Sequence, residues 1–549
     1  MRTEMTRSLG VAGIVLMVVA AAAPITVVVA NFPLILLESG SIGAPLMILA
    51  ATLILLLFAV GFTWMTPHVP DAGAFYAYVH QGLGRRAGLG TAAVALLSYV
   101  LLTVSMTCYL GVQTGNLLAL WSGVELPWWL ISALMIAVVG VLAHRRIDLS
   151  AAVLGVVLVL EILAVLAIDL GVLASGRELT PVPFSPAEAL SGAPGLGLLF
   201  AFLGFFGFEA TAVFRHEARD PLRTIPRATY VAVLLIGVLY TVSSWLVISG
   251  LGAEDALDAA AASPDTVVVA LAGDVVAPIM RDVTQVLVVT SMFACMLGFH
   301  NIVARYLFTL GRRGVLPSAL GQVHPVHRAP SRASLTVTGI TAAIVLVSAL
   351  AQLDPVVEIY TWYSGLGAIG VIAMMALTAL AVLRFGGLRG SGDRSAPGVR
   401  SAPGAARGSG GRRAGAITLV ATGLGGLGLF VVLGISLANF PLMVGGTVAA
   451  IVCAALLVGA FVLGAVAGPM RSTGAPEDGD AGAEMTVGET AADDEAPVDG
   501  ADEDPELTTD GRRQRPGVSR RRGRRARRPA SGAGRGRRAR SGSVPRSCR

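Results

Sequence analysis

The sequence predicts an all-α membrane protein with twelve transmembrane helices. Hydrophobic residues make up 54% of the 549 positions, charged residues only 14%, and the mean hydropathy is +0.72. Soluble domains carry about 25% charged residues, so most of this chain is suited to lipid. The apolar residues are gathered in runs of about 20, the length needed to cross a bilayer as a helix.

Twelve such runs, separated by polar or charged loops, define the predicted helices in order. The first six cover residues 10–32, 43–65, 88–114, 127–143, 151–173 and 196–214. The second six cover residues 228–250, 283–310, 333–350, 357–383, 415–438 and 444–467. The first run resembles a signal peptide with a cleavage site at Ala21–Ala23, but Pro24 follows directly and the apolar residues continue, which favours a retained span.

The arginine distribution supports this count and sets the orientation. The chain has no lysine, and 22 of the 24 arginines that precede the tail fall on the N-terminal side when the loops are numbered alternately. Only Arg177 and Arg281 fall on the other side. Because positive loops stay inside, both termini are predicted to be cytoplasmic in a multi-pass protein of the cell membrane, with the acidic segment 254–274 outside.

The composition changes after the last span. Residues 471–510 are rich in Gly, Ala, Asp and Glu, and sixteen arginines crowd into residues 512–549. With few aromatic or branched residues, the segment 471–549 is predicted to be a disordered cytoplasmic tail. Its charge would suit anionic lipid, whereas the absence of interleaved aromatic residues argues against nucleic acid. Residues 1–470 form the predicted membrane domain.

The sixth span contains a carboxylate. Glu209 lies near the end of an otherwise uncharged stretch, residues 196–214. An ionised carboxylate inside a membrane costs about 2.5 kcal/mol or more unless it faces a cavity or a partner. Gly204 and Gly207 precede it, and each weakens a helix by about 1 kcal/mol relative to Ala. A span with these features is typical of a broken transporter helix.

Other kinds of site are not supported. The cysteines, Cys108, Cys295, Cys453 and Cys548, have neither a disulfide pattern nor metal-ligand spacing. The sequence HEARD at 216–220 has Asp where a zinc-protease motif needs its second His. No nucleophile has a recognisable partner. We therefore expect no enzyme activity, no metal and no cofactor.

Three segments resemble amino acid permeases of the amino acid/polyamine/organocation superfamily. Residues 200–228 read FAFLGFFGFEATAVFRHEARDPLRTIPRA and resemble the sixth helix and following loop of that family. Residues 71–78, DAGAFYAY, with GLG at 82–84, and residues 299–317, FHNIVARYLFTLGRRGVLP, lie where the family has similar segments. The resemblance covers roughly residues 9–467.

The resemblance implies a leucine-transporter-type fold of two five-helix repeats with inverted topology, followed by two extra helices. The repeats would cover about 9–173 and 194–383, the extra helices about 415–467, and the first and sixth helices would be discontinuous. Three positions depart from the family pattern. The first break has Ala20–Thr26 in place of a Gly-Ser-Gly-like run, and His216 and Arg313 stand where acidic residues are common. Pro24 can still break the helix.

The predicted substrate site is the exposed backbone of the two breaks. Half-helix N-termini attract a substrate carboxylate, and carbonyl groups at opposing C-termini receive its ammonium group, so an amino acid zwitterion fits. The candidate residues are Ala21, Ala22, Ala23, Pro24, Ile25 and Thr26 in the first span and Phe205, Phe206, Gly207 and Phe208 in the sixth. Phe205 and Phe208 are expected to shape a side-chain pocket or gate.

The predicted function is a secondary active amino acid permease, working by alternating access and driven by protons. Glu209 and Glu161 are the proton-coupling candidates, because a low dielectric favours their neutral form and lets them exchange a proton. Asp169 is expected to be solvated near an outer helix end. His300 could join a relay or bond an inner loop, and a sodium site near Thr290 and Ser291 has weaker support.

Two alternatives remain open. An amino acid or polyamine exchanger on the same fold would need more pocket carboxylates than Glu209 and Glu161 provide. A receptor that uses the fold as a binding module would bind amino acids without transporting them. The sequence does not predict which amino acid is carried or the oligomeric state.

Overall fold

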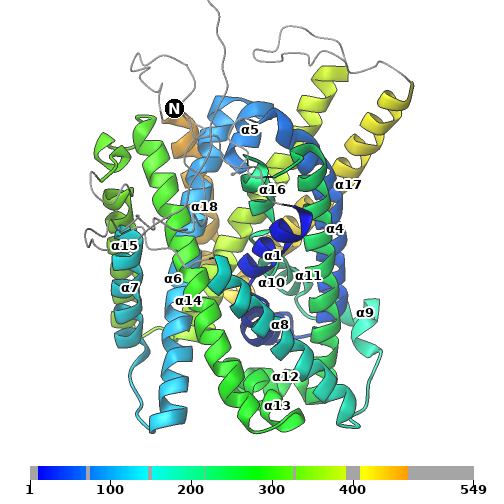
Figure 1. Ribbon diagram of the computed structural model, residues 1–549, viewed down its shortest axis with the longest axis vertical. Helices are drawn as coiled ribbons and strands as arrows, with labels where there is room; N and C mark the ends of the chain where they lie inside the picture. The colour runs from blue at the N-terminus through cyan, green and yellow to red at the C-terminus, as the bar shows by residue number, and fades with distance from the viewer. Residues whose placement is uncertain are drawn as a thin grey trace, which may run out of the picture. The chain divides into compact units, whose positions relative to one another are not determined.

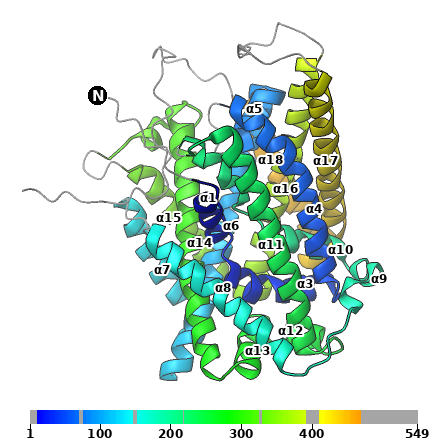
Figure 2. The ribbon, with the colours of Figure 1, turned by 45° about the vertical axis from the view of Figure 1, so that its right-hand side comes forward.

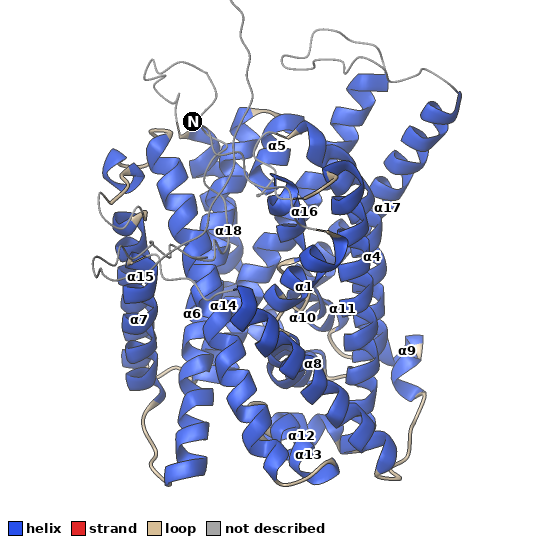
Figure 3. Ribbon diagram, viewed as in Figure 1, coloured by secondary structure: helices blue, strands red, loops and turns tan. Residues whose placement is uncertain are grey.

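The computed structural model describes residues 10–69, 75–145, 151–216, 218–324, 329–390 and 409–467. Within these ranges the regular structure is helical, and Figure 3 shows helices joined by short loops. All of them belong to one compact unit, Met1–Ala491. The predicted tail 471–549 and residues 71–74 of the family-like segment lie outside the described residues, so the predictions about them stay predictions.

The helices of the first half begin with a span in three pieces. Its bounds are α1 Val11–Ala21, α2 Pro24–Thr26, a π-helical turn Val27–Asn31 and α3 Phe32–Ser39. Then follow α4 Ala44–Met65, α5 Phe75–Leu83, α6 Arg85–Ser122, α7 Trp128–His144, α8 Ala151–Ala174 and α9 Pro186–Ala189. Short 3₁₀ turns lie at Thr66–His68 and Val182–Phe184.

The second half also begins with an interrupted span. Its bounds are α10 Pro194–Leu203 and the 3₁₀ helix η4, Phe208–His216. Then follow α11 Pro221–Leu251, α12 Ala256–Ala262, α13 Val267–Val275, α14 Ile279–Arg312 and α15 Ser331–Leu350. After a 3₁₀ turn, Ser318–Gly321, and a π-helical turn, Pro355–Tyr360, the last helices are α16 Thr361–Gly390, α17 Ser409–Met443 and α18 Thr447–Val466.

In the described part of the chain, 11 helices are long and apolar enough to cross a membrane. Each overlaps one of the predicted spans. The remaining prediction, residues 127–143, corresponds to α7, which is apolar but shorter. The count of twelve spans and the pairing of two inverted repeats therefore stay predictions, while the all-helical architecture agrees with the predicted fold class.

The interrupted spans lie inside the bundle. Of the residues in the most apolar part of Pro194–Ala212, 78% are buried inside the structure. The corresponding share is 28% for Gly415–Met443 and 17% for Thr447–Val466. The two extra helices therefore lie at the periphery and expose apolar side chains such as Val448 and Leu463. Figure 1 shows α12 and α13 at the end of the bundle opposite α5. Figure 2 shows α8 crossing in front of α14 and reaching towards α13.

Candidate functional site

The first span is interrupted at Ala22 and Ala23. Helix α1 ends at Ala21, and Ala23 has φ 47° and ψ 69°, the left-handed region that a residue with a Cβ adopts at a cost of about 1 kcal/mol or more. Pro24 begins the next helical turn and has no N–H to donate. The small residues and the proline together place polar backbone groups in the middle of an apolar span.

The sixth span is interrupted at residues 204–207. Helix α10 ends at Leu203, four residues form turns, and Gly207 has φ 107°, which favours glycine. The chain then continues from Phe208 as a 3₁₀ helix, whose hydrogen bonding is tighter and less regular than that of an α-helix. Gly207 is therefore required by the backbone conformation.

The two interruptions are in contact. A Cβ added at Gly207 would lie 3.2 Å from Ala21 Cβ, and one added at Gly204 would lie 3.1 Å from Val27 Cγ1. One turn away, Asn31 Nδ2 donates a 3.0 Å hydrogen bond to the Phe200 carbonyl. Backbone groups freed by both interruptions therefore face one small region, as an amino acid site between the breaks requires.

Glu209 binds the backbone of its own break. Its Oε2 accepts a 2.9 Å hydrogen bond from the Gly207 N–H, and its Oε1 accepts one of 3.2 Å from the Tyr99 hydroxyl on α6. The side chain is half-buried. The carboxyl group thus satisfies a backbone donor that the interruption of the helix leaves free.

Glu161 plays the same part at the first interruption. It lies on α8, is 4% exposed, and its Oε2 accepts a hydrogen bond of 3.4 Å from the Ile25 N–H. The Tyr240 hydroxyl, from α11, donates to the Ala22 carbonyl at 3.1 Å. Both sides of the first break therefore have a side-chain partner, an acceptor for its donor and a donor for its acceptor.

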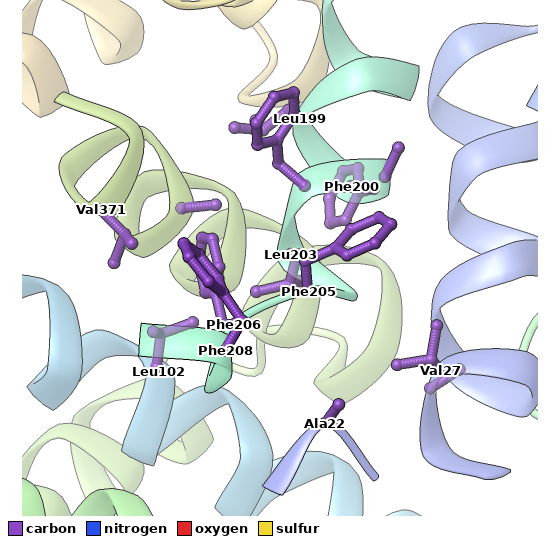
Figure 4. Packing of buried hydrophobic residues seen from close by; sticks show 14 of the residues in the cluster. Ala22, Val27, Leu102, Leu199, Phe200, Leu203, Phe205, Phe206, Phe208 and Val371 are labelled. Carbon is purple, nitrogen blue, oxygen red and sulfur yellow. The ribbon is translucent and has the colours of Figure 1, made fainter. Parts of the chain in front are cut away.

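The three phenylalanines at the sixth break differ in direction. In Figure 4, Phe205 lies on the Val27 side, whereas the rings of Phe206 and Phe208 lie on the side of Leu102 and Val371. All three are buried. Phe205 packs against Tyr240 with ring centroids 6.1 Å apart, and Phe208 packs against Phe58 and Phe62. Apolar groups thus surround the backbone of this break.

The remaining candidates have ordinary partners. His300 Nε2 lies 3.0 Å from the Ser334 hydroxyl on α15, so it contacts a helix and not the inner loop considered from the sequence. The Thr290 hydroxyl bonds the carbonyls of Val286 and Leu287 in its own helix. Among the described residues, no cluster of three or more His, Cys, Asp or Glu side chains could hold a metal ion.

Asp169 differs from the sequence-based expectation. It was expected to be solvated, but it is 5% exposed and its Oδ2 accepts a 2.7 Å hydrogen bond from the Ser243 hydroxyl on α11. The physical reason is coverage: α13 packs on this end of α8, where Gly171 approaches the Val275 carbonyl and Val276.

Arg313 is one of the two departures at positions where the family pattern has an acidic residue. Its guanidinium lies 5.8 Å from the centre of the Tyr76 ring. It also faces His80 on α5, which lies outside the spans. Burial, the Arg313 charge and the Arg85 charge together lower the pKa of His80. This region is thus strongly basic. The side chain of His216, the other departure, lies outside the described residues.

The comparison with protein families decides the identity of the fold. The model described as amino acid permease matches residues 9–461, nearly the whole membrane domain. The chain belongs to the amino acid permease family. This membership confirms the predicted family and an all-helical permease fold. It also confirms a multi-pass membrane protein, with candidate spans along the whole domain.

Several curated permeases are similar in sequence. The branched-chain amino acid permease BcaP of Lactococcus lactis is 26% identical over 296 residues, 50% of this chain and 62% of the relative. Cationic amino acid transporter 7, chloroplastic, of Arabidopsis thaliana is 27% identical over 331 residues, 57% of this chain and 56% of the relative. The low-affinity putrescine importer PlaP of Escherichia coli is 24% identical over 317 residues, 55% of this chain and 65% of the relative. The matched regions thus span less than two thirds of each relative.

Proposed function

We propose that the protein is a secondary active amino acid permease that works by alternating access and couples transport to protons. One observation carries the proposal. Two interrupted spans are in contact, and at each interruption a glutamate accepts a hydrogen bond from a backbone N–H that the interruption leaves free. Glu209 accepts from Gly207, and Glu161, on α8, accepts from Ile25.

The substrate carboxylate would bind where these glutamates now bind. A freed backbone N–H suits an amino acid carboxylate for the same reason that it suits a glutamate carboxylate. An ionised Glu209 therefore competes with the substrate for the Gly207 N–H. Once protonated, Glu209 loses its negative charge and accepts more weakly, which leaves the N–H available. Substrate and proton would then bind together, as a symporter requires.

The surroundings of the sixth break favour a neutral, apolar side chain. The relatives are named for branched-chain amino acids, cationic amino acids and putrescine, so family membership leaves the class open. The break is packed by apolar groups such as Leu102 and Val371. A cationic side chain or a diamine would need a carboxylate of its own. Glu209 and Glu161 already bind backbone donors, which argues against a polyamine exchanger.

The coupling is tested in proteoliposomes with labelled leucine as the probe. An inward proton gradient is expected to drive accumulation, and an inward sodium gradient is not. The proposed site has two carboxyl groups, one buried and one half-buried, and the Thr290 hydroxyl bonds its own helix. Uptake that is insensitive to collapse of the pH gradient and membrane potential, but lost without sodium, would contradict proton coupling.

Counterflow separates the alternatives. With saturating unlabelled leucine inside and no gradient, a permease exchanges label, whereas a receptor binds it without flux. An exchanger shows counterflow but no net uptake under a proton gradient. Putrescine and arginine serve as competitors, and stronger inhibition by either than by valine would argue for a cationic substrate.

We also propose that both termini are cytoplasmic. The proposal rests on the arginine count and places Asp258, an exposed residue of α12, outside, and Arg400 inside. A cysteine introduced at position 258 is expected to react with an impermeant thiol reagent in intact cells, and one at position 400 only after permeabilisation. The variants are compared with the unaltered chain, whose own cysteines set the background. The reverse pattern would overturn the orientation.

A further inference from the structure

Asp169 is a second buried carboxylate of α8 that the proposed substrate site does not use. It is 5% exposed and its side-chain hydrogen bond comes from Ser243. A buried carboxylate in a span is costly and commonly marks an ion or proton path. Among the described residues, Ser243 gives it one neutral donor, which is little compensation for a permanent negative charge.

Asp169 and Glu161 lie on one side of α8. They are eight residues apart, a spacing that returns to the same face of a helix and corresponds to about 12 Å along its axis. In the predicted orientation this helix runs outward, so Asp169 is the outer of the two. Both are almost fully buried.

The neighbouring helices α11 and α14 also carry polar side chains at two positions, an inner one beside Glu161 and one further out. On α11, Tyr240 reaches the first break beside Glu161, and Ser243, one turn further out, binds Asp169. On α14, Ser291 lies beside Glu161, and Thr284 lies seven residues away, on the same face and towards the outside. The Thr284 hydroxyl is buried, with no hydrogen-bond partner among the described residues, and the buried Ser291 hydroxyl faces the Glu161 carboxyl group.

We propose that Asp169 is the outer station of a proton route that leads to Glu161 between α8, α11 and α14. This inference rests on the proposed proton coupling and adds a residue to it. The buried hydroxyls of Thr284 and Ser291, together with the two carboxyl groups, can hold the water that such a route needs, because an enclosed water requires two or more polar groups. Apolar side chains alone would not hold water there.

The transfer itself is a simple exchange. Asp169 takes a proton from outside water, and its O–H bond then breaks as the proton passes to a neighbouring water. Successive transfers along a chain of waters release a proton to Glu161 at the other end. The O–H bond formed on Glu161 neutralises the carboxylate that holds the Ile25 N–H. Two arginines near the outer end of the bundle have partners other than Asp169. Arg177 donates to the Gly250 carbonyl, and Arg281 pairs with Asp274.

The experiment compares variants of Asp169 in oriented proteoliposomes, measuring labelled leucine uptake and proton entry with an internal pH dye. Asp169→Asn is expected to lower proton-driven uptake and proton entry at least about tenfold and to leave counterflow within about twofold. Asp169→Glu should retain most of both, because it keeps a carboxyl group. Asp258→Asn, at an exposed carboxylate on the outside, is the matched control and should change neither.

Ser243→Ala gives a second measurement that keeps the carboxyl group. It removes the hydrogen bond to Asp169, and proton entry should slow while counterflow persists. Equal loss of uptake and counterflow in Asp169→Asn, without rescue by Glu, would show a structural role and overturn the proposal. Unchanged proton entry would also overturn it. If the unaltered protein shows uptake without proton entry, the proposed coupling itself fails, a result distinct from an effect at Asp169.

Discussion

Replacing Glu209 with Gln is expected to abolish proton-driven accumulation while exchange continues. Gln keeps the length of the side chain and a carbonyl oxygen that can accept from the Gly207 N–H, while its amide NH2 can donate to the Tyr99 hydroxyl oxygen. It cannot ionise, so the competition between Glu209 and the substrate carboxylate no longer depends on protons. Accumulation should fall to the level set by leak, and the affinity for leucine should lose its pH dependence.

The measurement pairs uptake under a proton gradient with counterflow, and both with leucine binding at several pH values. Glu188→Gln, on the short helix α9 at the edge of the bundle (Figure 1), is the matched control. If Glu209 stays protonated and serves only as a structural acid, Gln should be silent in every assay. Persisting pH dependence in Glu209→Gln would transfer the coupling role to Glu161.

Replacing Gly207 with Ala is expected to lower transport by more than tenfold. At φ 107° a residue with a Cβ is strained by about 1–2 kcal/mol, and the new methyl group would lie 3.2 Å from Ala21 Cβ. An increase of about 1.4 kcal/mol in the barrier already slows a rate tenfold. The substitution also presses on the other break, so substrate affinity should fall together with the rate.

Gly298→Ala is the control, because this glycine of α14 has open space where a Cβ would be added. Transport and the yield of folded protein should remain near those of the unaltered chain. The Gly207→Ala protein should still be recovered from detergent as a folded monodisperse species, so that the loss reflects the site. Normal transport in Gly207→Ala would contradict the assignment of this break to the substrate path.

Local chemistry explains why the sequence located the helices and both interruptions. Apolar length, the Pro24 ring and the conformational freedom of Gly207 act within a few residues, so their effects can be predicted from the local sequence. The partners of those interruptions cannot. Tyr99 lies 110 positions from Glu209, and Glu161 lies 136 positions from Ile25. Only the packing of α6 and α8 against the broken spans brings these groups together.

The burial of Asp169 also could not be predicted from the local sequence. Its place near the end of a predicted span indicates exposure to solvent, because the sequence of one helix does not show what covers it. Burial comes from α11, which supplies Ser243, and from α13, a short helix in a loop about 100 residues later. Tyr240, another residue that the sequence did not single out, lies in an unremarked apolar run and becomes relevant through its bond to the Ala22 carbonyl.

The sixth span is tethered differently at its two ends. The peptide groups of Gly195 in α10 are held by α17, since Asn439 accepts from its N–H and Ser436 donates to its carbonyl. Beyond the break, Thr211 accepts a hydrogen bond from Thr229 of α11. The first half is therefore hydrogen-bonded to the peripheral helix α17 and the second half to α11. We propose that residues 204–207 act as a joint, so that a rigid link there would stop the halves from moving independently.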